Sequence, residues 1–328
     1  MALTVRHVLI LRALGLGDFL TGVPAYRALR SAHRDAVLTL AAPAYLEPLV
    51  SLTGAIDRLL PTDGLSELGP AQRPELAVNL HGRGPQSIDV LLRTDAAKLI
   101  THRHPLRPKV AGPAWQDDLH EVQRWCRLLK LAGIPADPDD LRLSPPALAP
   151  PLSGAIVIHP GAASPARRWP AERFGAVAQQ LGETGHPVVV TGSRAEKRIV
   201  EVVISSGDLP ANSNLCGELD LGQLAASISS ARLLISGDTG VAHLASAYGR
   251  PSVVLFGPTP PSQWGPPPHG PHTVLWRGST GDPHADQPDA GLIRIAVPEV
   301  VRAARTRLEL PPAESAQSRR MTSSTAPV

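Results

Sequence analysis

The segment 231–266 places the tightest limits on the fold of this chain. It begins with a short apolar run, 231–236, that is typical of a buried strand, and a second such run follows at 252–256. Between them, the turn 237–240 ends the first strand, and an alanine-rich helix is expected over 241–248. Two buried strands joined by a helix form a βαβ unit, which indicates a parallel sheet covered by helices.

The turn inside this unit is a candidate anion-binding site. A helix that begins directly after a buried strand directs its free backbone N–H groups and its positive dipole end at one spot. Asp238 or Thr239 is expected to cap this helix, and His243 lies on the same helix face as Thr239. Taken singly, Asp238 is equally well explained as a helix cap and His243 as a core histidine.

The same alternation of apolar runs and helical segments extends along the chain. The first half begins with a predicted strand at 5–11, a glycine turn that ends in Asp18, and a helix over 19–31. A proline-rich stretch, 134–153, separates it from the second half. The chain is therefore expected to be an α/β protein with parallel sheets. Its expected parts are two domains and a disordered tail, namely 1–148, 149–310 and 311–328.

Two histidine-containing stretches are weak candidates for a metal site. The segment 268–291 is rich in Pro, His and Asp and is predicted to be a loop. Within it Asp282, His284 and Asp286 alternate, but alternation in a proline-rich loop is weak evidence for a ligand set. The H-x-H sequence at 102–104 has no third ligand placed beside it. We therefore expect no metal site.

Charge and composition exclude several classes of protein. The formal net charge of +3 is spread along the chain, which gives no reason to expect a nucleic-acid partner. No apolar stretch approaches the roughly 20 residues that span a bilayer, and the run 8–11 is too short for a signal peptide. Two distant cysteines suit a reducing compartment. The protein is expected in the cytoplasm, where its basic surface would favour peripheral contact with the inner face of the plasma membrane.

The motifs around the central turn resemble those of glycosyltransferase family 9, the heptosyltransferase family. The resemblance covers about 5–32 and 156–308, and it implies a GT-B architecture, in which two Rossmann-like domains with parallel sheets face a central cleft. The matching motifs are D-T-G-x-x-H-L-A at 238–245, G-x-P at 249–251, F-G-P-T at 256–259 and W-G-P at 264–266. The chain departs from the family in an extra Gly15-Leu16 and in the absence of cysteines at 281–289.

The resemblance implies an inverting glycosyltransferase. It would move a heptose-like sugar from a nucleoside diphosphate donor, most often ADP-heptose in this family, to a hydroxyl of a glycan or lipid-linked acceptor. No cofactor or metal is implied. Two other functions would use the same cleft: a sugar-nucleotide enzyme without transfer, such as a GT-B epimerase, and a nucleotide-sugar binding module without catalysis. The epimerase would need no acceptor base at Asp18, and detectable sugar transfer separates both from a transferase.

The resemblance also assigns roles to individual residues. Asp18 matches the family's general base, and a carboxylate at this glycine turn would repel a phosphate. The implied donor-binding residues are Gly161, Ala162 and Arg167 beside the diphosphate, Glu196 at the ribose, Leu219 at the base, and Asp238, Thr239, Gly240 and His243 around the diphosphate and sugar. We place Asp238 against sugar hydroxyls, because its charge would repel the diphosphate. Arg167 stands where the family usually has lysine, and its guanidinium fork suits a phosphate.

Overall fold

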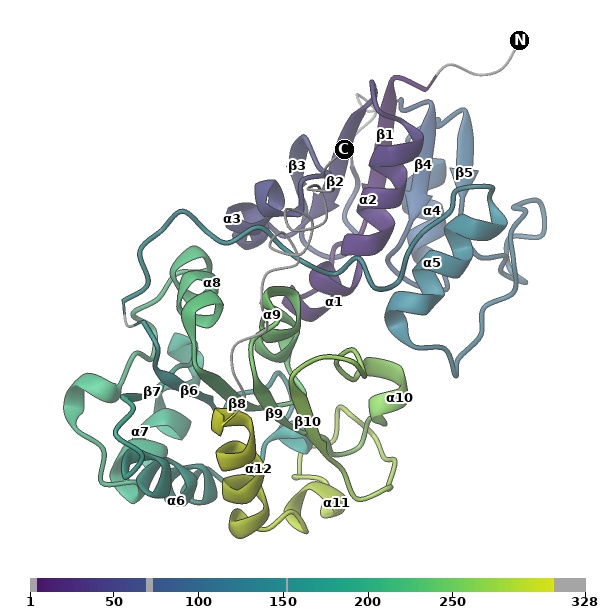
Figure 1. Cartoon of the computed structure of the whole chain (residues 1–328). Helices are drawn as coiled ribbons and strands as arrows, with labels where there is room; N and C mark the ends of the chain where they lie inside the picture. Colours follow the sequence, from purple (N-terminus) through teal and green to yellow (C-terminus); the bar gives the residue numbers. More distant parts are fainter. Residues whose placement is uncertain (1–4, 69–72, 152, 310–328) are drawn as a thin grey trace, which may run out of the picture.

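The computed structural model describes residues 5–68, 73–151 and 153–309. They form two lobes, each built on a five-stranded parallel sheet covered by helices (Figure 1). This arrangement confirms the predicted α/β class and its GT-B architecture. The domain bounds at 148 and 310 stay a prediction, and the tail predicted at 311–328 lies outside the described residues.

The first sheet has the strand order β3-β2-β1-β4-β5. Its strands are β1 (His7–Leu11), β2 (Val37–Ala42), β3 (Arg58–Pro61), β4 (Leu76–Asn79) and β5 (Lys98–Ile100). The helices of this lobe are α1 (Leu16–Thr21), α2 (Val23–Ala32), α3 (Glu47–Val50), α4 (Gln86–Leu92) and α5 (Glu121–Leu131). From β1 the chain runs through β2 to β3 at one edge and then returns to β4 on the other side of β1, so the strand order reverses between β1 and β4. Ligands of open parallel sheets bind at such a reversal, outside the carboxyl ends of the strands.

The second sheet has the order β10-β9-β8-β6-β7, which reverses between β6 and β8. Its strands are β6 (Ile156–His159), β7 (Val188–Val190), β8 (Leu233–Gly237), β9 (Ser252–Leu255) and β10 (His272–Leu275). Its helices are α6 (Ala171–Gly182), α7 (Lys197–Ser206), α8 (Leu221–Ser230), α9 (Gly240–Tyr248), α10 (Pro261–Trp264), α11 (Ala290–Ile293) and α12 (Val297–Glu309). The βαβ unit predicted from 231–256 is therefore β8-α9-β9.

Two sequence predictions need correction. The segment 268–291 is not a continuous loop, because β10 lies within it and pairs in parallel with β9. β10 is an edge strand whose side chains are only half-buried. Its short apolar run follows several prolines, so the sequence pattern did not predict a strand there. The helix predicted over 19–31 begins earlier and is two helices, α1 and α2, which meet at Gly22. A Cβ on Gly22 would collide with the hydroxyl of Tyr26, so the bend holds only glycine without rearrangement.

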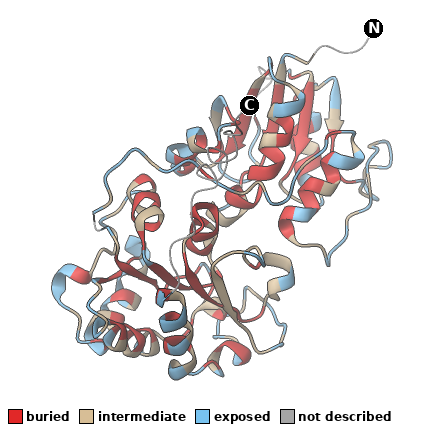
Figure 2. Ribbon diagram, viewed as in Figure 1, coloured by how far each residue is buried: buried red, intermediate tan, exposed pale blue. Residues whose placement is uncertain are grey.

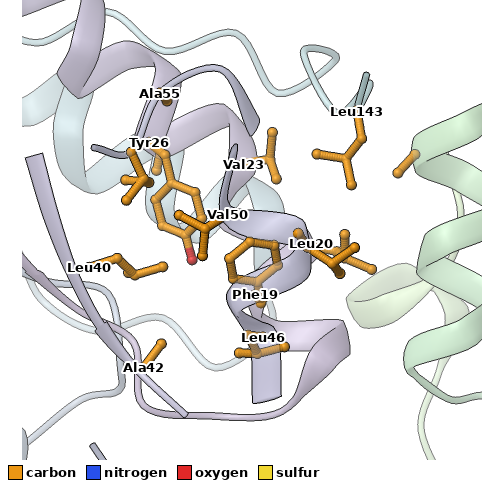
Figure 3. Close-up of a cluster of buried hydrophobic side chains, with 14 of the residues drawn as sticks. Phe19, Leu20, Val23, Tyr26, Leu40, Ala42, Leu46, Val50, Ala55 and Leu143 are labelled. Atoms are coloured by element: carbon orange, nitrogen blue, oxygen red, sulfur yellow. The ribbon is translucent and has the colours of Figure 1, made fainter. Parts of the chain in front are cut away.

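One apolar cluster joins the two lobes. Buried residues of the first sheet and of α9 in the second lobe belong to the same cluster, and both elements are coloured as buried in Figure 2. Phe19, Tyr26 and Val50 pack together in the first lobe, and Leu20 and Leu143 lie on the side toward the second lobe (Figure 3). The backbone N–H of Leu143 also donates to the carbonyl of Ala247 in α9, at 3.1 Å. The lobes thus share a packed core on one side of the cleft.

We expect Gly175→Ala to lower the free energy of unfolding by about 1–3 kcal/mol, because it overpacks a close helix crossing. A Cβ on Gly175 in α6 would lie 2.9 Å from the backbone nitrogen of Gly207, directly after α7. Gly182, in the last turn of the same helix, has open space around its Cα and serves as the control. Gly182→Ala is expected to be neutral or stabilising. Urea unfolding of both variants checks this, and equal stabilities would contradict it.

Candidate functional site

A cleft of about 730 Å³ lies between the lobes. Its walls come from the carboxyl ends of β1, β6, β7 and β8 and from the turns and helices that follow these strands. Of the residues that the sequence assigned to the site, those lining the cleft are Asp18, Arg167, Glu196, Leu219, Asp238, Thr239, Gly240 and His243. Gly161 and Ala162 belong to a loop that reaches the cleft through His159 and Ala163 instead.

Two glycines allow the first turns of α1 and α9 to meet across the cleft. A Cβ on Gly240 would lie only 2.8 Å from the Cβ of Leu16 and 3.0 Å from the backbone nitrogen of Gly17. A Cβ on Gly17 would lie 3.0 Å from Cδ2 of His243. Larger residues at either position would push the helices apart. The contact brings the first turn of α1, which contains Asp18, against the first turn of α9.

Asp18 is a partly buried carboxylate in the first turn of α1, where a helix dipole favours negative charge. It is not the cap of this helix, because the N-cap position belongs to Gly15. Burial raises the pKa of Asp18, and the positive charge of Arg12 offsets part of that effect. Nη2 of Arg12 lies 3.6 Å from Oδ1 of Asp18. A carboxylate with a raised pKa at a cleft wall is suited to accept a proton from a bound hydroxyl.

Asp238 lies on the other side of the cleft, at the end of β8. The N-cap of α9 is Thr239, whose side chain makes no capping hydrogen bond, so Asp238 does not cap the helix. Burial raises the pKa of Asp238 to about 6, although the nearby Arg167 lowers it in part. A buried carboxylate of this kind is costly to the free protein and favours hydrogen-bond donors that reach it.

Arg167 is a cation of the second lobe that faces the cleft. It ends a short 3-10 turn, Pro165–Arg167, and its Nη1 lies 3.5 Å from the carbonyl oxygen of Asp238. Its Nε is buried and makes no hydrogen bond within the protein. Arg168 differs, since its Nε donates to the carbonyl of Ala162 at 2.9 Å. Arg167 therefore has donor capacity for an anion in the cleft, beside the N-terminus of α9.

Glu196 is held by a capping box at the start of the turn after β7. Its Oε2 accepts hydrogen bonds from the backbone nitrogen and the hydroxyl of Ser193, at 2.7 and 2.8 Å. The same carboxylate passes so close to Gly161 that a Cβ there would collide with it. Gly161 thus makes room for Glu196. Both hydrogen bonds from Ser193 go to Oε2, so Oε1 of Glu196 can accept from a ligand. Behind them, Nδ1 of the buried His159 lies 3.0 Å from the hydroxyl of Thr191.

Several cleft residues were missed by sequence reasoning. Tyr45 enters from the turn after β2, where no motif marks it, and its side chain is half exposed. Trp264 is part of the W-G-P motif but received no role, although its ring lies 6.0 Å from that of His243. Ser193 comes from a loop without a motif, and His284 was considered only as part of the weak alternation of Asp282, His284 and Asp286. Most of these residues reach the cleft because of tertiary folding. The motif around Trp264 offered a signal, as did the F-G-P-T motif, whose Thr259 also lines the cleft.

Within residues 5–68, 73–151 and 153–309, no three His, Cys, Asp or Glu side chains gather where they could hold a metal ion. In the same part of the chain, no helix is both long enough and apolar enough to cross a bilayer.

Comparison with known proteins gave consistent matches. The sequence profile of glycosyltransferase family 9 (heptosyltransferase) matches residues 109–286. Lipopolysaccharide heptosyltransferase 2 of Escherichia coli K12 is 26% identical over 294 residues, which cover 77% of this chain and 83% of that protein. The structure of E. coli ADP-heptose lps heptosyltransferase II superposes with a TM-score of 0.76 at 23% identity, covering 92% and 98% of the two chains. E. coli heptosyltransferase WaaC, solved with ADP, gives 0.67 at 18% identity, covering 92% and 99%.

We expect Asp238→Asn to stabilise the ligand-free protein increasingly as the pH rises. The pKa of Asp238 is about 6 in the folded protein and 3.8 in its ordinary range, so the folded state holds the proton more tightly. The wild type therefore loses stability from this group as the pH rises from about 4 through 6. The variant avoids this loss and gains up to about 3 kcal/mol at pH 7.5.

Urea unfolding at pH 4.5 and 7.5 measures this effect. Asp286→Asn, at an exposed carboxylate, is the control and should give the same small difference from wild type at both values. If the Asp238→Asn difference is also independent of pH, Asp238 carries no buried charge in the free protein.

Proposed function

Because the chain belongs to glycosyltransferase family 9, we propose that it transfers a heptose-like sugar from ADP-heptose to a hydroxyl of a glycan or lipid-linked acceptor. One observation carries this proposal: the first turns of α1 and α9 meet, so that Asp18 and the Asp238-Thr239-Gly240 turn line one cleft from opposite lobes. A donor bound by the second lobe would present its anomeric carbon to an acceptor bound by the first.

The proposed donor is supported by the charges of the cleft and by the relatives. The relatives' names include an ADP-heptose heptosyltransferase and a heptosyltransferase solved with ADP. In our assignment Arg167, with Gly161 and Ala162 of the neighbouring loop, lies beside the diphosphate. Glu196 meets the ribose and Leu219 packs on the base. The turn residues Asp238, Thr239 and Gly240, together with His243, surround the diphosphate and sugar, with Asp238 on sugar hydroxyls.

The proposed reaction is a direct displacement with inversion. Asp18 takes the proton from the acceptor hydroxyl, and that oxygen forms a bond to the anomeric carbon from the face opposite the diphosphate. The bond between the anomeric carbon and the diphosphate oxygen breaks at the same time, and its electron pair leaves with the diphosphate. Arg167 and the N-terminus of α9 stabilise the negative charge that develops there. Asp18 then releases its proton to solvent.

Asp18 also argues against the two alternative functions. A sugar-nucleotide epimerase or a binding module would use the donor side of the cleft, but neither needs a carboxylate on the acceptor side. The raised pKa of Asp18 is what a general base for a hydroxyl requires. Sugar transfer measured with purified protein, ADP-heptose and a lipid-linked acceptor tests the proposal, and donor binding without any transfer would refute it.

We expect Asp18→Asn to lower the turnover number by about 10²- to 10⁴-fold, because the amide cannot accept the acceptor proton. The affinity for ADP should stay close to that of the wild type, since Asp18 lies on the opposite lobe from Arg167. Asp63→Asn, at an exposed carboxylate of the same lobe, is the control for loss of charge. A variant that retains more than about a tenth of the wild-type turnover would remove Asp18 from the role of base.

We expect Arg167→Ala to weaken the binding of ADP about ten- to a hundredfold, because a charge-assisted hydrogen bond contributes about 1.5–3 kcal/mol. Calorimetry with ADP measures this without an acceptor. The control is Arg168→Ala, which removes a neighbouring cation whose Nε is engaged with the carbonyl of Ala162. If Arg168→Ala weakens the binding of ADP and Arg167→Ala does not, the phosphate contact belongs to Arg168.

A further inference from the structure

We propose that Glu121 is a positioning residue for the transfer reaction: it binds Arg12 and thereby limits how strongly that cation neutralises the base, Asp18. The inference rests on the role given to Asp18 under the proposed function. Glu121 lies outside the sequence motifs that identify the family, and it does not line the cleft. It acts through Arg12.

Arg12 is the link between the two carboxylates. It follows β1, is fully buried, and its guanidinium donates to the main-chain carbonyls of Asp18 and Leu80. Its Nη2 donates to the hydroxyl of Thr21 at 2.9 Å. The same nitrogen lies 3.1 Å from Oε1 of Glu121 and 3.6 Å from Oδ1 of Asp18. The hydrogen bond therefore goes to Glu121, and Asp18 interacts with Arg12 only across the longer distance.

Glu121 is itself rigidly held at the first position of α5. Its side chain is only 10% exposed, and Oε1 also accepts a hydrogen bond from Nε1 of Trp125 at 2.8 Å. Its Oε2 lies 3.1 Å from Nε of Arg124. The ring of Trp125 also lies beneath Arg12, with 5.1 Å between the guanidinium carbon and the ring centroid. The position of Arg12 relative to Asp18 is thus fixed from the side of α5.

The charges of this cluster balance only with Glu121 present. Arg12 and Arg124 are two cations, and Glu121 and Asp18 are two carboxylates. Because the cluster is buried, its charges interact strongly. If the charge of Glu121 is removed, the field of Arg12 acts on Asp18 without opposition and stabilises its ionised form. Asp18 then becomes a weaker base for the acceptor hydroxyl.

The other titratable groups around Asp18 are neutral near pH 7, so they do not obscure this balance. Burial lowers the pKa of His81, after β4, and of His243, in α9, to about 4. Burial also lowers the pKa of His120, the N-cap of α5. It raises the pKa of Tyr26 and of Tyr45, which keeps both hydroxyls protonated. Glu121 also raises the pKa of Asp18 through its charge, in agreement with the geometry.

The test is the pH dependence of kcat/KM for Glu121→Gln in the full-length enzyme. Glutamine retains one acceptor oxygen, which can replace Oε1 as the shared acceptor for Arg12 and Trp125, but it removes the negative charge. The acidic limb contains the ionisation of Asp18 and that of Asp238, whose pKa is about 6. Because Glu121 contacts Arg12 and not Asp238, only the part that belongs to Asp18 should move to lower pH than in the wild type. The plateau should fall roughly three- to tenfold, because a weaker base accepts the proton less readily. The affinity for ADP should not change.

Two further variants separate the effect of charge from a loss of packing. Trp125→Phe removes the neutral hydrogen bond to the same carboxylate but keeps its charge, so its acidic limb should coincide with that of the wild type. Glu121→Asp keeps the negative charge at this position of α5 but withdraws it from Arg12 by one methylene group. Its limb should move in the same direction as that of Glu121→Gln, but less. This variant also serves if Glu121→Gln does not fold.

The outcomes distinguish this inference from its premise. A uniform loss of activity with an unmoved acidic limb, in both Glu121 variants, would show that Glu121 is only structural. A limb that moves equally in Trp125→Phe would also overturn the inference. If Asp18→Asn retains turnover, the assignment of the base itself is wrong. If Asp18→Asn is inactive and the limb of the Glu121 variants stays in place, only the present inference fails.

Discussion

The contact between the first turns of α1 and α9 is the constraint on which the site depends. Gly17 and Gly240 carry no side chains, and the space that a Cβ would need is filled by the opposite helix. Each lobe follows ordinary rules for a parallel sheet, with its ligand-binding edge at the carboxyl ends of the strands. Only the close approach of the two helices turns two such edges into one cleft, with one carboxylate, Asp18 or Asp238, on each side.

Buried charge is the second feature that the site is built on. Arg12 and Asp238 are nearly inaccessible to solvent, and Asp18 is only partly exposed. Groups in such surroundings interact more strongly than in water and keep fixed positions before any ligand arrives. In the proposed reaction this means that the proton acceptor and the cation beside the leaving group need little rearrangement. Burial of these charges lowers the stability of the free protein, and the apolar core that the two lobes share offsets this loss.

The sequence predicted those parts of the fold whose signals are local. β1 and β8 are short apolar runs and α9 is an alanine-rich run, and each ends at a glycine or is followed by one within a few residues, so these local signals are enough to find them. β10 was missed because all four of its side chains are only half-buried, so this edge strand needs only a weak apolar pattern. At the break between α1 and α2, a Cβ on Gly22 would collide with the hydroxyl of Tyr26, and the sequence pattern alone does not reveal this close contact.

The site residues also divide into those with a local sequence signal and those that only folding brings together. The D-T-G-x-x-H-L-A motif led to Asp238, Thr239, Gly240 and His243, which the structure brings together in the cleft. Glu121 could not be found in this way, because its partner Arg12 lies 109 residues earlier in the chain. Tyr45 reaches the cleft from a turn without a motif. Groups that act through a fixed neighbour leave no local pattern, and only the folded chain reveals them.

The unsatisfied groups of the cleft also bear on how a donor would be recognised. Arg167 has a buried Nε without a partner, and Asp238 is a carboxylate whose charge is costly at neutral pH. On the proposed function, a nucleoside diphosphate without its sugar would satisfy Arg167 and place more negative charge near Asp238. A nucleotide sugar would satisfy both, because its hydroxyl groups donate to Asp238. The two groups together would therefore favour the intact donor over the departing diphosphate, which is the difference that a transferase needs in order to release its product.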